Sequence, residues 1–511
     1  MSRDRALIGA AVGVVLAHCA TGALFVGGSA GAWRGFPLDD AWIHLVYARG
    51  IAHHGGPYYN DGVLEAGFTS PLWMLALGLV ELVGRVGAPV VALVKGLGVG
   101  CAAAASLGVL ALARRLGASL GGALFGALTL ALSPSFAFAQ VSGMEVPLAG
   151  ACAVWAMERL AAGRLWHAGG LLAAAAVSRP ELGVLVALVA LAHLRRPRLL
   201  IPLVAPSAVA ALLWSAYCLA VTGHPLPNTF YAKAHGGGLD SAWHVLSGPV
   251  MDMPLFASIT GAVLWGGGIV ALCVRHRLLG GLVAGAPLVF VVAVGLSRSM
   301  PPHAGAYFYW LRWALPVEPL LIVPAAVGLG ALWAHAVGSP AVRRLIAALL
   351  VGGVVASVPG PLTDRVEQYA ANCTNIEEVQ VAMGRWVAAN VAPHEGVMVN
   401  DAGAIRYFGG RRTVDLIGLN THELLFGVPR TLRDLARRNT KGMLELMAHV
   451  GGDVLIVFPS WAAPLFQSHT FQRLFTPVHV LRSERYTVSP GRQELMVALR
   501  RTAVDVAPAT Q

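Results

Sequence analysis

Two adjacent carboxylates, Asp39 and Asp40, follow the first long apolar stretch of the chain. A carboxylate beside another has a raised pKa and can accept a proton from a hydroxyl group. Acidic residues at a membrane boundary are costly unless they are paired, solvated or used. We therefore take both as candidate catalytic residues, with Asp39 as the base and Asp40 as its structural partner. The alternative is that one of them only caps a helix beginning at Ala41.

Further polar residues interrupt the apolar segments and could act with this pair. The candidates for substrate binding are Glu65, Glu145, Arg179, Glu181, Asn228, Tyr231, Lys233 and Arg312. The three cations among them could hold a phosphate, since arginine binds its oxygens with two parallel hydrogen bonds. Five of these residues also have a structural alternative: a helix cap at Glu145, a local ion pair between Arg179 and Glu181, and interfacial cations at Lys233 and Arg312.

A metal site has only weak support. Asp40 and His44 have the i, i+4 spacing of two ligands on one helical face. No third ligand is evident, and a hydrogen bond between the two side chains on one helix face also explains the spacing. We therefore assign no metal ligand and no cofactor, and leave a divalent metal ion as an open alternative.

The composition predicts a polytopic membrane protein. Of 511 residues, 56% are hydrophobic and 12% are charged, and the mean hydropathy is +0.65. Soluble domains carry about 25% charged residues, so this chain has too little polar surface to cover a soluble particle. The net charge of +11 comes largely from short basic clusters between apolar runs. This pattern reports membrane topology, and no nucleic-acid partner is expected.

Apolar runs and basic clusters together predict about eleven spans with a cytoplasmic N-terminus. The expected spans are residues 6–28, 90–113, 119–138, 147–162, 165–178, 181–194, 199–222, 254–274, 278–297, 315–336 and 344–358. Six basic clusters then lie inside, and all candidate site residues lie in extracytoplasmic loops. We expect an integral protein of the inner (plasma) membrane.

The segments outside these spans have a different character. Residues 41–54 and 72–84 predict two helices lying in the outer membrane interface. The stretch 360–511 is more polar, with a helical pattern over 376–391 and β-like runs at 396–400 and 454–458. We therefore predict a transmembrane domain over 1–359 and a small extracytoplasmic α/β domain over 360–511.

Several motifs occur in an order that is typical of one superfamily. They are DDAWI (39–43), EAGFTSPLW (65–73), SGME (142–145), RPE (179–181), PNTFYAK (227–233) and Arg312 followed by Pro316. The chain resembles the GT-C membrane glycosyltransferases, and most closely the branch containing terminal arabinofuranosyltransferases. Two stretches depart from that branch: Val46 stands where arginine is usual, and residues 65–67 read EAG instead of EG.

This resemblance implies a GT-C fold, a polyprenyl-phosphate sugar donor and a first-loop aspartate as base. The acceptor would be a glycan or a lipid, the sugar is a pentofuranose in the nearest branch, and membrane lipids would surround the chain. Two other classes stay open: a transporter or flippase of lipid-linked glycans, and a non-catalytic membrane scaffold.

Overall fold

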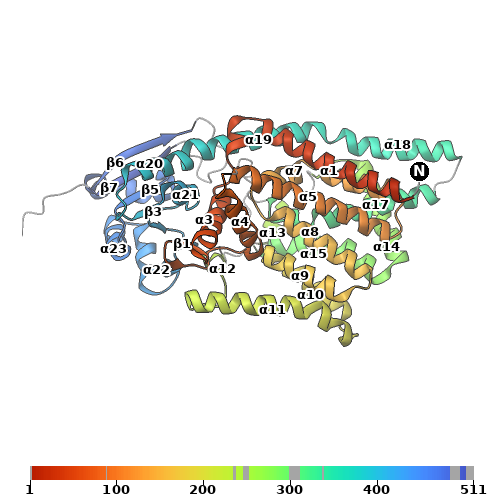
Figure 1. Ribbon diagram of the computed structural model, residues 1–511, viewed down its shortest axis with the longest axis horizontal. Coiled ribbons are helices and arrows are strands. Elements are labelled where there is room, and N and C mark those ends of the chain that lie inside the picture. Colours follow the sequence, from red (N-terminus) through yellow and green to blue (C-terminus); the bar gives the residue numbers. More distant parts are fainter. Residues whose placement is uncertain are drawn as a thin grey trace, which may run out of the picture.

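The computed structural model describes residues 3–87, 89–233, 238–245, 253–297, 311–335, 339–483 and 495–501. A bundle of helices forms most of the molecule, and a small domain with a β-sheet lies at one end of it (Figure 1). The predicted fold class, a helical bundle followed by a C-terminal α/β region, is therefore confirmed.

Within the described residues, six helices are long and apolar enough to cross a membrane. They correspond to α1 (Arg3–Gly27), α5 (Val90–Arg115), α11 (Pro197–Thr222), α15 (Arg277–Ser297), α17 (Glu318–His335) and α18 (Pro340–Ala356). A seventh crossing is obtained if α6 (Leu120–Ala131) and α7 (Pro134–Val141), which are bent by 60° relative to each other, count as one span.

The remaining predicted spans coincide with shorter helices. These are α8 (Val146–Ala161), α9 (Leu165–Ser178), α10 (Gly183–His193) and α14 (Ile259–Arg275). A helix rises 1.5 Å per residue, so fewer than 18 residues reach less than the ~30 Å of a hydrocarbon core. Every predicted span is helical, but the number of eleven crossings is not confirmed.

The segment between α1 and α5 is folded compactly. It contains α2 (Ala30–Arg34), α3 (Asp39–His54), a hairpin of β1 (Tyr58–Asn60) and β2 (Val63–Leu64), and α4 (Pro71–Gly84). The two helices predicted here are confirmed, and α3 begins two residues before the expected start. Both aspartates thus lie in its first turn, where the helix dipole favours negative charge.

A single helical segment of 51 residues, Pro340–Asn390, leads from the bundle into the tail. It comprises α18, α19 (Pro359–Ile376), a π-helical turn at 377–381 and α20 (Ala382–Asn390), and α18 and α19 follow one edge of the bundle in Figure 1. The boundary predicted at 359/360 therefore falls in the first turn of α19, within this helical segment.

The tail contains a five-stranded sheet. Its order is β4 (Thr413–Asp415), β3 (Val397–Val399), β5 (Val454–Val457), β7 (Leu495–Arg501) and β6 (Phe475–Arg482). Strands β4, β3 and β5 are parallel, and β7 pairs antiparallel with β5 and β6. The strands predicted at 396–400 and 454–458 are confirmed as β3 and β5.

Short helices connect and flank the strands and the bundle. They are α12 (Asn228–Lys233), α13 (Leu239–Val245), α21 (Ala404–Gly409), α22 (Gly427–Ala436), α23 (Thr440–Val450), α24 (Ala463–Phe466) and α25 (His469–Leu474). One apolar cluster joins Val46 and Tyr47 of α3 to Val397 and Val399 of β3. The first loop and the tail therefore share a hydrophobic core.

Candidate functional site

Asp40 lies at the centre of the candidate site. Its Oδ2 accepts a hydrogen bond of 2.5 Å from Nη2 of Arg312, which lies 272 residues further along the chain. Arg312 is 3% exposed, whereas 26% of the Asp40 side chain is open to solvent. Burial raises the pKa of Asp40, but the positive charges of Arg312 and then Lys233 outweigh it and lower this pKa to about 2. Asp40 is therefore a carboxylate at neutral pH.

Asp39 is used differently. Its Oδ2 accepts a hydrogen bond from the backbone N–H of Gly403 (2.7 Å), and its Oδ1 accepts one from Ala404 (2.8 Å), at the start of α21. Burial, and then the charge of Asp401, raise the pKa of Asp39 well above its ordinary value. Asp39 thus attaches the first turn of α3 to the tail domain, and both of its oxygens are engaged.

Gly403 is required by this attachment. A Cβ at this position would lie 2.2 Å from the backbone oxygen of Asp39 and 2.8 Å from its Oδ2. Real Cβ atoms do not approach other atoms so closely, so only glycine allows the backbone before α21 to lie against Asp39 of α3.

A second ion pair lies next to the first. Arg179, which follows α9, donates from Nη1 to Oε1 of Glu145, the residue preceding α8. The other Glu145 oxygen lies 3.5 Å from Nε2 of His44 on α3, and Arg179 Nε lies 3.6 Å from Glu181. Burial raises the pKa of Glu145, but Arg179 and His44 lower it more strongly, to well below its ordinary range.

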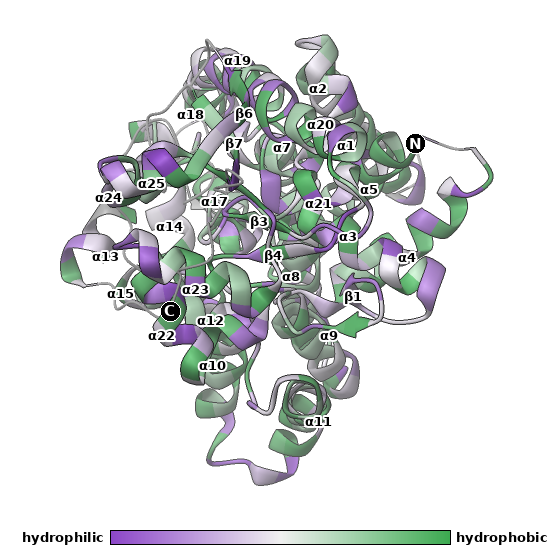
Figure 2. Cartoon of the chain, turned by 90° about the vertical axis from the view of Figure 1, so that its left-hand side faces the viewer, coloured by the Kyte–Doolittle hydropathy of each residue, from purple (hydrophilic) through white to green (hydrophobic). Residues whose placement is uncertain are grey.

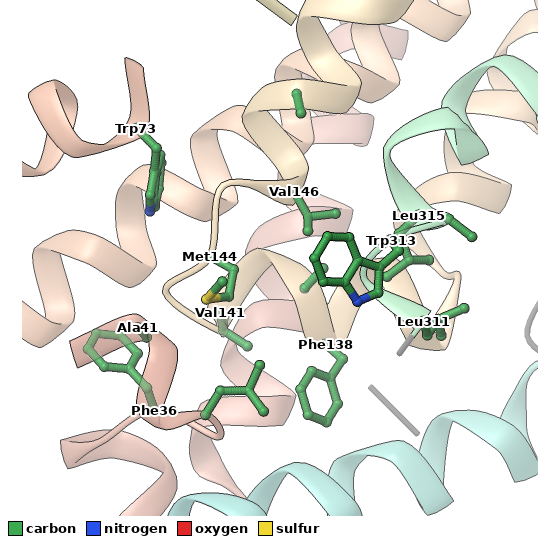
Figure 3. Packing of buried hydrophobic residues seen from close by; sticks show 14 of the residues in the cluster. Phe36, Ala41, Trp73, Phe138, Val141, Met144, Val146, Leu311, Trp313 and Leu315 are labelled. Carbon is green, nitrogen blue, oxygen red and sulfur yellow. The ribbon is translucent and has the colours of Figure 1, made fainter. Parts of the chain in front are cut away.

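Trp313 links the two arginines. The guanidinium carbons of Arg179 and Arg312 lie 4.5 Å and 5.4 Å from the centre of its ring. Figure 3 shows this ring between the Leu311–Leu315 segment and the loop carrying Met144. Four segments far apart in sequence, which carry Asp40, Glu145, Arg179 and Arg312, therefore bring their polar groups to one site.

Unused hydrogen-bonding capacity remains at this site. Among the described residues, neither Nη2 of Arg179 nor Nδ1 of His44 has a hydrogen-bond partner, although both atoms are buried. A buried unpaired donor costs free energy, about 1–3 kcal/mol for a neutral group and more for a charged one. The arrangement can thus donate to an anionic or hydroxyl-bearing ligand.

Glu65, Asn228 and Tyr231 lie in separate surroundings. Glu65 accepts from Asn228 Nδ2 (3.0 Å) and lies 3.1 Å from Nδ1 of His422, so it joins the first loop, α12 and the tail. Tyr231 packs edge-on against Phe426 of the tail, with ring centres 5.3 Å apart. The structure therefore brings together Asp40, Glu145, Arg179, Glu181 and Arg312, with Lys233 within electrostatic reach, and places the other three candidates at the joint with the tail.

Sequence reasoning missed two contributors. Trp313 directly follows Arg312, and its stacking role has no separate sequence signal. From the sequence, His44 is a candidate metal ligand or a hydrogen-bonding partner of Asp40 on the same helix, but in the structure it contacts Glu145. In the described part of the chain, no three His, Cys, Asp or Glu side chains are grouped as metal ligands would be.

The fold is similar to that of GT-C glycosyltransferases of known structure. The chain superposes on apo ArnT from Cupriavidus metallidurans with a TM-score of 0.62 at 13% identity, covering 96% of this chain and 98% of ArnT. The TM-score is 0.55 at 12% identity for the oligosaccharyltransferase AglB from Archaeoglobus fulgidus, with 88% of this chain and 69% of AglB covered.

The superposition on the arabinofuranosyltransferase AftD from mycobacteria also has a TM-score of 0.55, at 17% identity. It includes 99% of this chain and 42% of AftD. Residues 372–497 match a family described as a domain of unknown function, DUF8728. No curated protein matches the sequence.

Proposed function

We propose that the chain is a membrane glycosyltransferase that transfers a sugar from a polyprenyl-phosphate donor to a glycan or lipid acceptor. The observation that carries this proposal is the meeting of Asp40, Arg312, Arg179 and Glu145 around Trp313, where a buried N–H of Arg179 has no hydrogen-bond partner among the described residues. A scaffold would have no use for such a polar cluster, because unpaired buried donors only destabilise it. Similar folds include an ArnT structure bound to undecaprenyl phosphate and an AglB structure in complex with a dolichol-phosphate.

The proposed reaction is a displacement at the anomeric carbon. An acceptor oxygen forms the new bond to this carbon, and the bond to the lipid-phosphate oxygen breaks. The phosphate leaves with the bonding electrons, and Arg312, Lys233 and Arg179 stabilise its charge. Glu145 holds Arg179 in place, and Glu181 adds a second carboxylate beside it.

We assign the base to Asp40 and a positioning role to Asp39, which reverses the assignment expected from sequence. A base needs an oxygen that the acceptor hydroxyl can reach, and Asp40 is partly exposed whereas both Asp39 oxygens accept backbone hydrogen bonds. Donor phosphate binding to Arg312 would weaken its pairing with Asp40. The pKa of Asp40 would then rise, which makes it a stronger base when the donor is present.

The topology predicted from charge places this site on the extracytoplasmic face of the plasma membrane, with the N-terminus in the cytoplasm. The polyprenyl chain would lie among the apolar helices. Glu65, Asn228 and Tyr231 would hold α12 and the tail so that an acceptor can approach Asp40.

The test is a transfer assay with the purified full-length chain in lipid nanodiscs, using polyprenyl-phosphate pentofuranose and hexose donors. Asp40→Asn should lower the transfer rate by roughly 10²–10⁴-fold in a chain that still folds, as a cooperative thermal unfolding transition would show. Asp61→Asn is the matched control: it lies in the same loop, pairs with Arg406 at 3.0 Å, and its side chain is 78% exposed. Equal activity of the two variants would overturn the proposal.

A further inference from the structure

A cavity of about 620 Å³ lies between α12 and the tail domain. Its wall includes Tyr231 from α12, Trp461 from the tail, and Arg430, Arg433 and Arg437 from α22 and its C-terminal end. Figures 1 and 2 both show α12 and α22 side by side. None of its lining residues belongs to the six long apolar helices.

The cavity carries an excess of positive charge. The three arginines are spaced i, i+3 and i+7, and Asp434 is the one acidic residue among the lining residues. That carboxylate is used by Arg433, whose Nη2 donates to it at 3.1 Å. Within the described chain Arg430 forms no ion pair. Burial and the neighbouring Arg433 lower the pKa of Arg437 more than Asp434 and Asp415 raise it.

Aromatic rings complete the wall. Phe426 stacks on His224 with ring centres 3.5 Å apart and meets Tyr231 edge-on, while Trp461 is half-buried. The electron-rich face of an aromatic ring attracts groups with positive edges, and the C–H face of a sugar ring is such a group. Rings combined with arginines are therefore suited to a sugar that carries negative charge.

Helix α12 relates the cavity to the proposed transfer site. Tyr231 faces the cavity, and two residues later Lys233 acts electrostatically on Asp40. The same short helix therefore contributes one residue to the cavity wall and one charge that acts on Asp40.

We propose that this cavity binds an acidic segment of the acceptor glycan, one bearing a carboxylate or a phosphate. The inference rests on the proposed transferase function and adds to it the chemical class of the acceptor. Arg430 and Arg437 bind the acidic group, and Tyr231 and Trp461 contact the sugar rings.

Binding can be measured apart from transfer, by isothermal titration of the full-length chain in nanodiscs without donor. The probes are trigalacturonate, maltotriose phosphorylated at one hydroxyl, neutral maltotriose and inorganic phosphate. At least one of the two acidic trisaccharides should bind about tenfold more tightly than neutral maltotriose, and about tenfold more tightly than inorganic phosphate. One charge-assisted hydrogen bond is enough to give a difference of this size. Equal binding of maltotriose, or equal binding of phosphate alone, would overturn the proposal.

Variants locate the site. Arg430→Ala should weaken binding of the acidic trisaccharide about tenfold, and Arg430 is exposed, so its removal leaves folding intact. Arg438→Ala is the matched control, since it removes an exposed arginine of the same segment that does not line the cavity. Equal effects of the two substitutions would overturn the assignment.

The two proposals can fail separately. Asp40→Asn should lower the transfer rate by roughly 10²–10⁴-fold and leave binding of the acidic trisaccharide unchanged. A chain that binds it selectively but transfers no sugar from any donor would refute the transferase function alone. A chain that transfers sugar but binds neutral and acidic trisaccharides equally would refute the cavity assignment alone.

Discussion

Replacing Arg312 by lysine keeps the positive charge of the site but removes the planar fork of N–H donors. In the structure this fork places Nη2 at 2.5 Å from Asp40 while the guanidinium carbon lies 5.4 Å from the Trp313 ring. A lysine ammonium is a point charge and cannot keep both contacts and also bind a phosphate with two hydrogen bonds. One charge-assisted hydrogen bond contributes about 1.5–3 kcal/mol.

If that hydrogen bond is made to the leaving phosphate, kcat/KM should fall roughly 10- to 150-fold in Arg312→Lys, since 1.36 kcal/mol corresponds to a factor of ten. The assay is transfer from a polyprenyl-phosphate sugar, with kcat and KM determined separately and the unfolding temperature measured alongside.

Arg385→Lys provides a matched control. Arg385 pairs with Glu377 at 2.8 Å and lies 5.5 Å from the Phe408 ring, so it makes the same two kinds of contact outside the site. Its replacement should change kcat/KM by less than about twofold. Full activity of Arg312→Lys, or an equal loss in both variants, would refute the assignment of Arg312 to the phosphate.

Three further outcomes are expected. Gly403→Ala should lower the unfolding temperature of the full chain because the new Cβ would collide with Asp39. Gly360→Ala, at a position with open space around it, should leave the unfolding temperature unchanged. Equal unfolding temperatures of the two variants would show that the close approach of Gly403 to Asp39 does not contribute to stability. Trp313→Leu should lower kcat/KM by roughly 3- to 30-fold through loss of its cation–π contacts with two arginines. The control Trp386→Leu removes a ring stacked on His479 in the tail and should leave kcat/KM unchanged. A larger loss of kcat/KM in Trp386→Leu than in Trp313→Leu would exclude the role of Trp313. Burial raises the pKa of Asp401 from 3.8 to about 6, so the Asp401 carboxyl binds its proton more tightly in the folded state than in the unfolded state. The contribution of this proton to the free energy of unfolding is complete below about pH 4 and is lost as the pH rises through 6. Asp401→Asn should therefore unfold at a higher temperature than the wild type at pH 7 and at the same temperature near pH 4. The control Asp364→Asn, at an exposed position in α19, should unfold at the wild-type temperature at both pH values. A difference in unfolding temperature between Asp401→Asn and the wild type that is the same at pH 4 and pH 7 would contradict the prediction.

Much of the candidate site could be predicted because its residues interrupt apolar segments. Glu145, Arg179 and Arg312 are conspicuous charges at the ends of hydrophobic runs. A charge there must be paired, solvated or used, which makes it visible without a structure. The same contrast predicts the helices, although helix length and not apolar character limits how many of them can span a membrane.

The roles within the acidic pair could not be predicted in this way. Asp39 and Asp40 are neighbours in sequence and identical in type, but successive residues on a helix project about 100° apart. One therefore meets the backbone of Gly403 and the other meets Arg312. Neither partner is close in sequence.

The sequence by itself determined that this chain has many apolar helices, a polar first loop and a tail with strands, because hydrophobic periodicity and charge placement are local properties. Only the tertiary structure decided which charges meet. The ion pairs Asp40–Arg312 and Glu145–Arg179 join residues 272 and 34 positions apart, and the cavity wall combines Tyr231 with arginines some 200 residues later. Such contacts depend on how helices pack against one another and on the shared core of the first loop and the tail, and no local pattern encodes that arrangement.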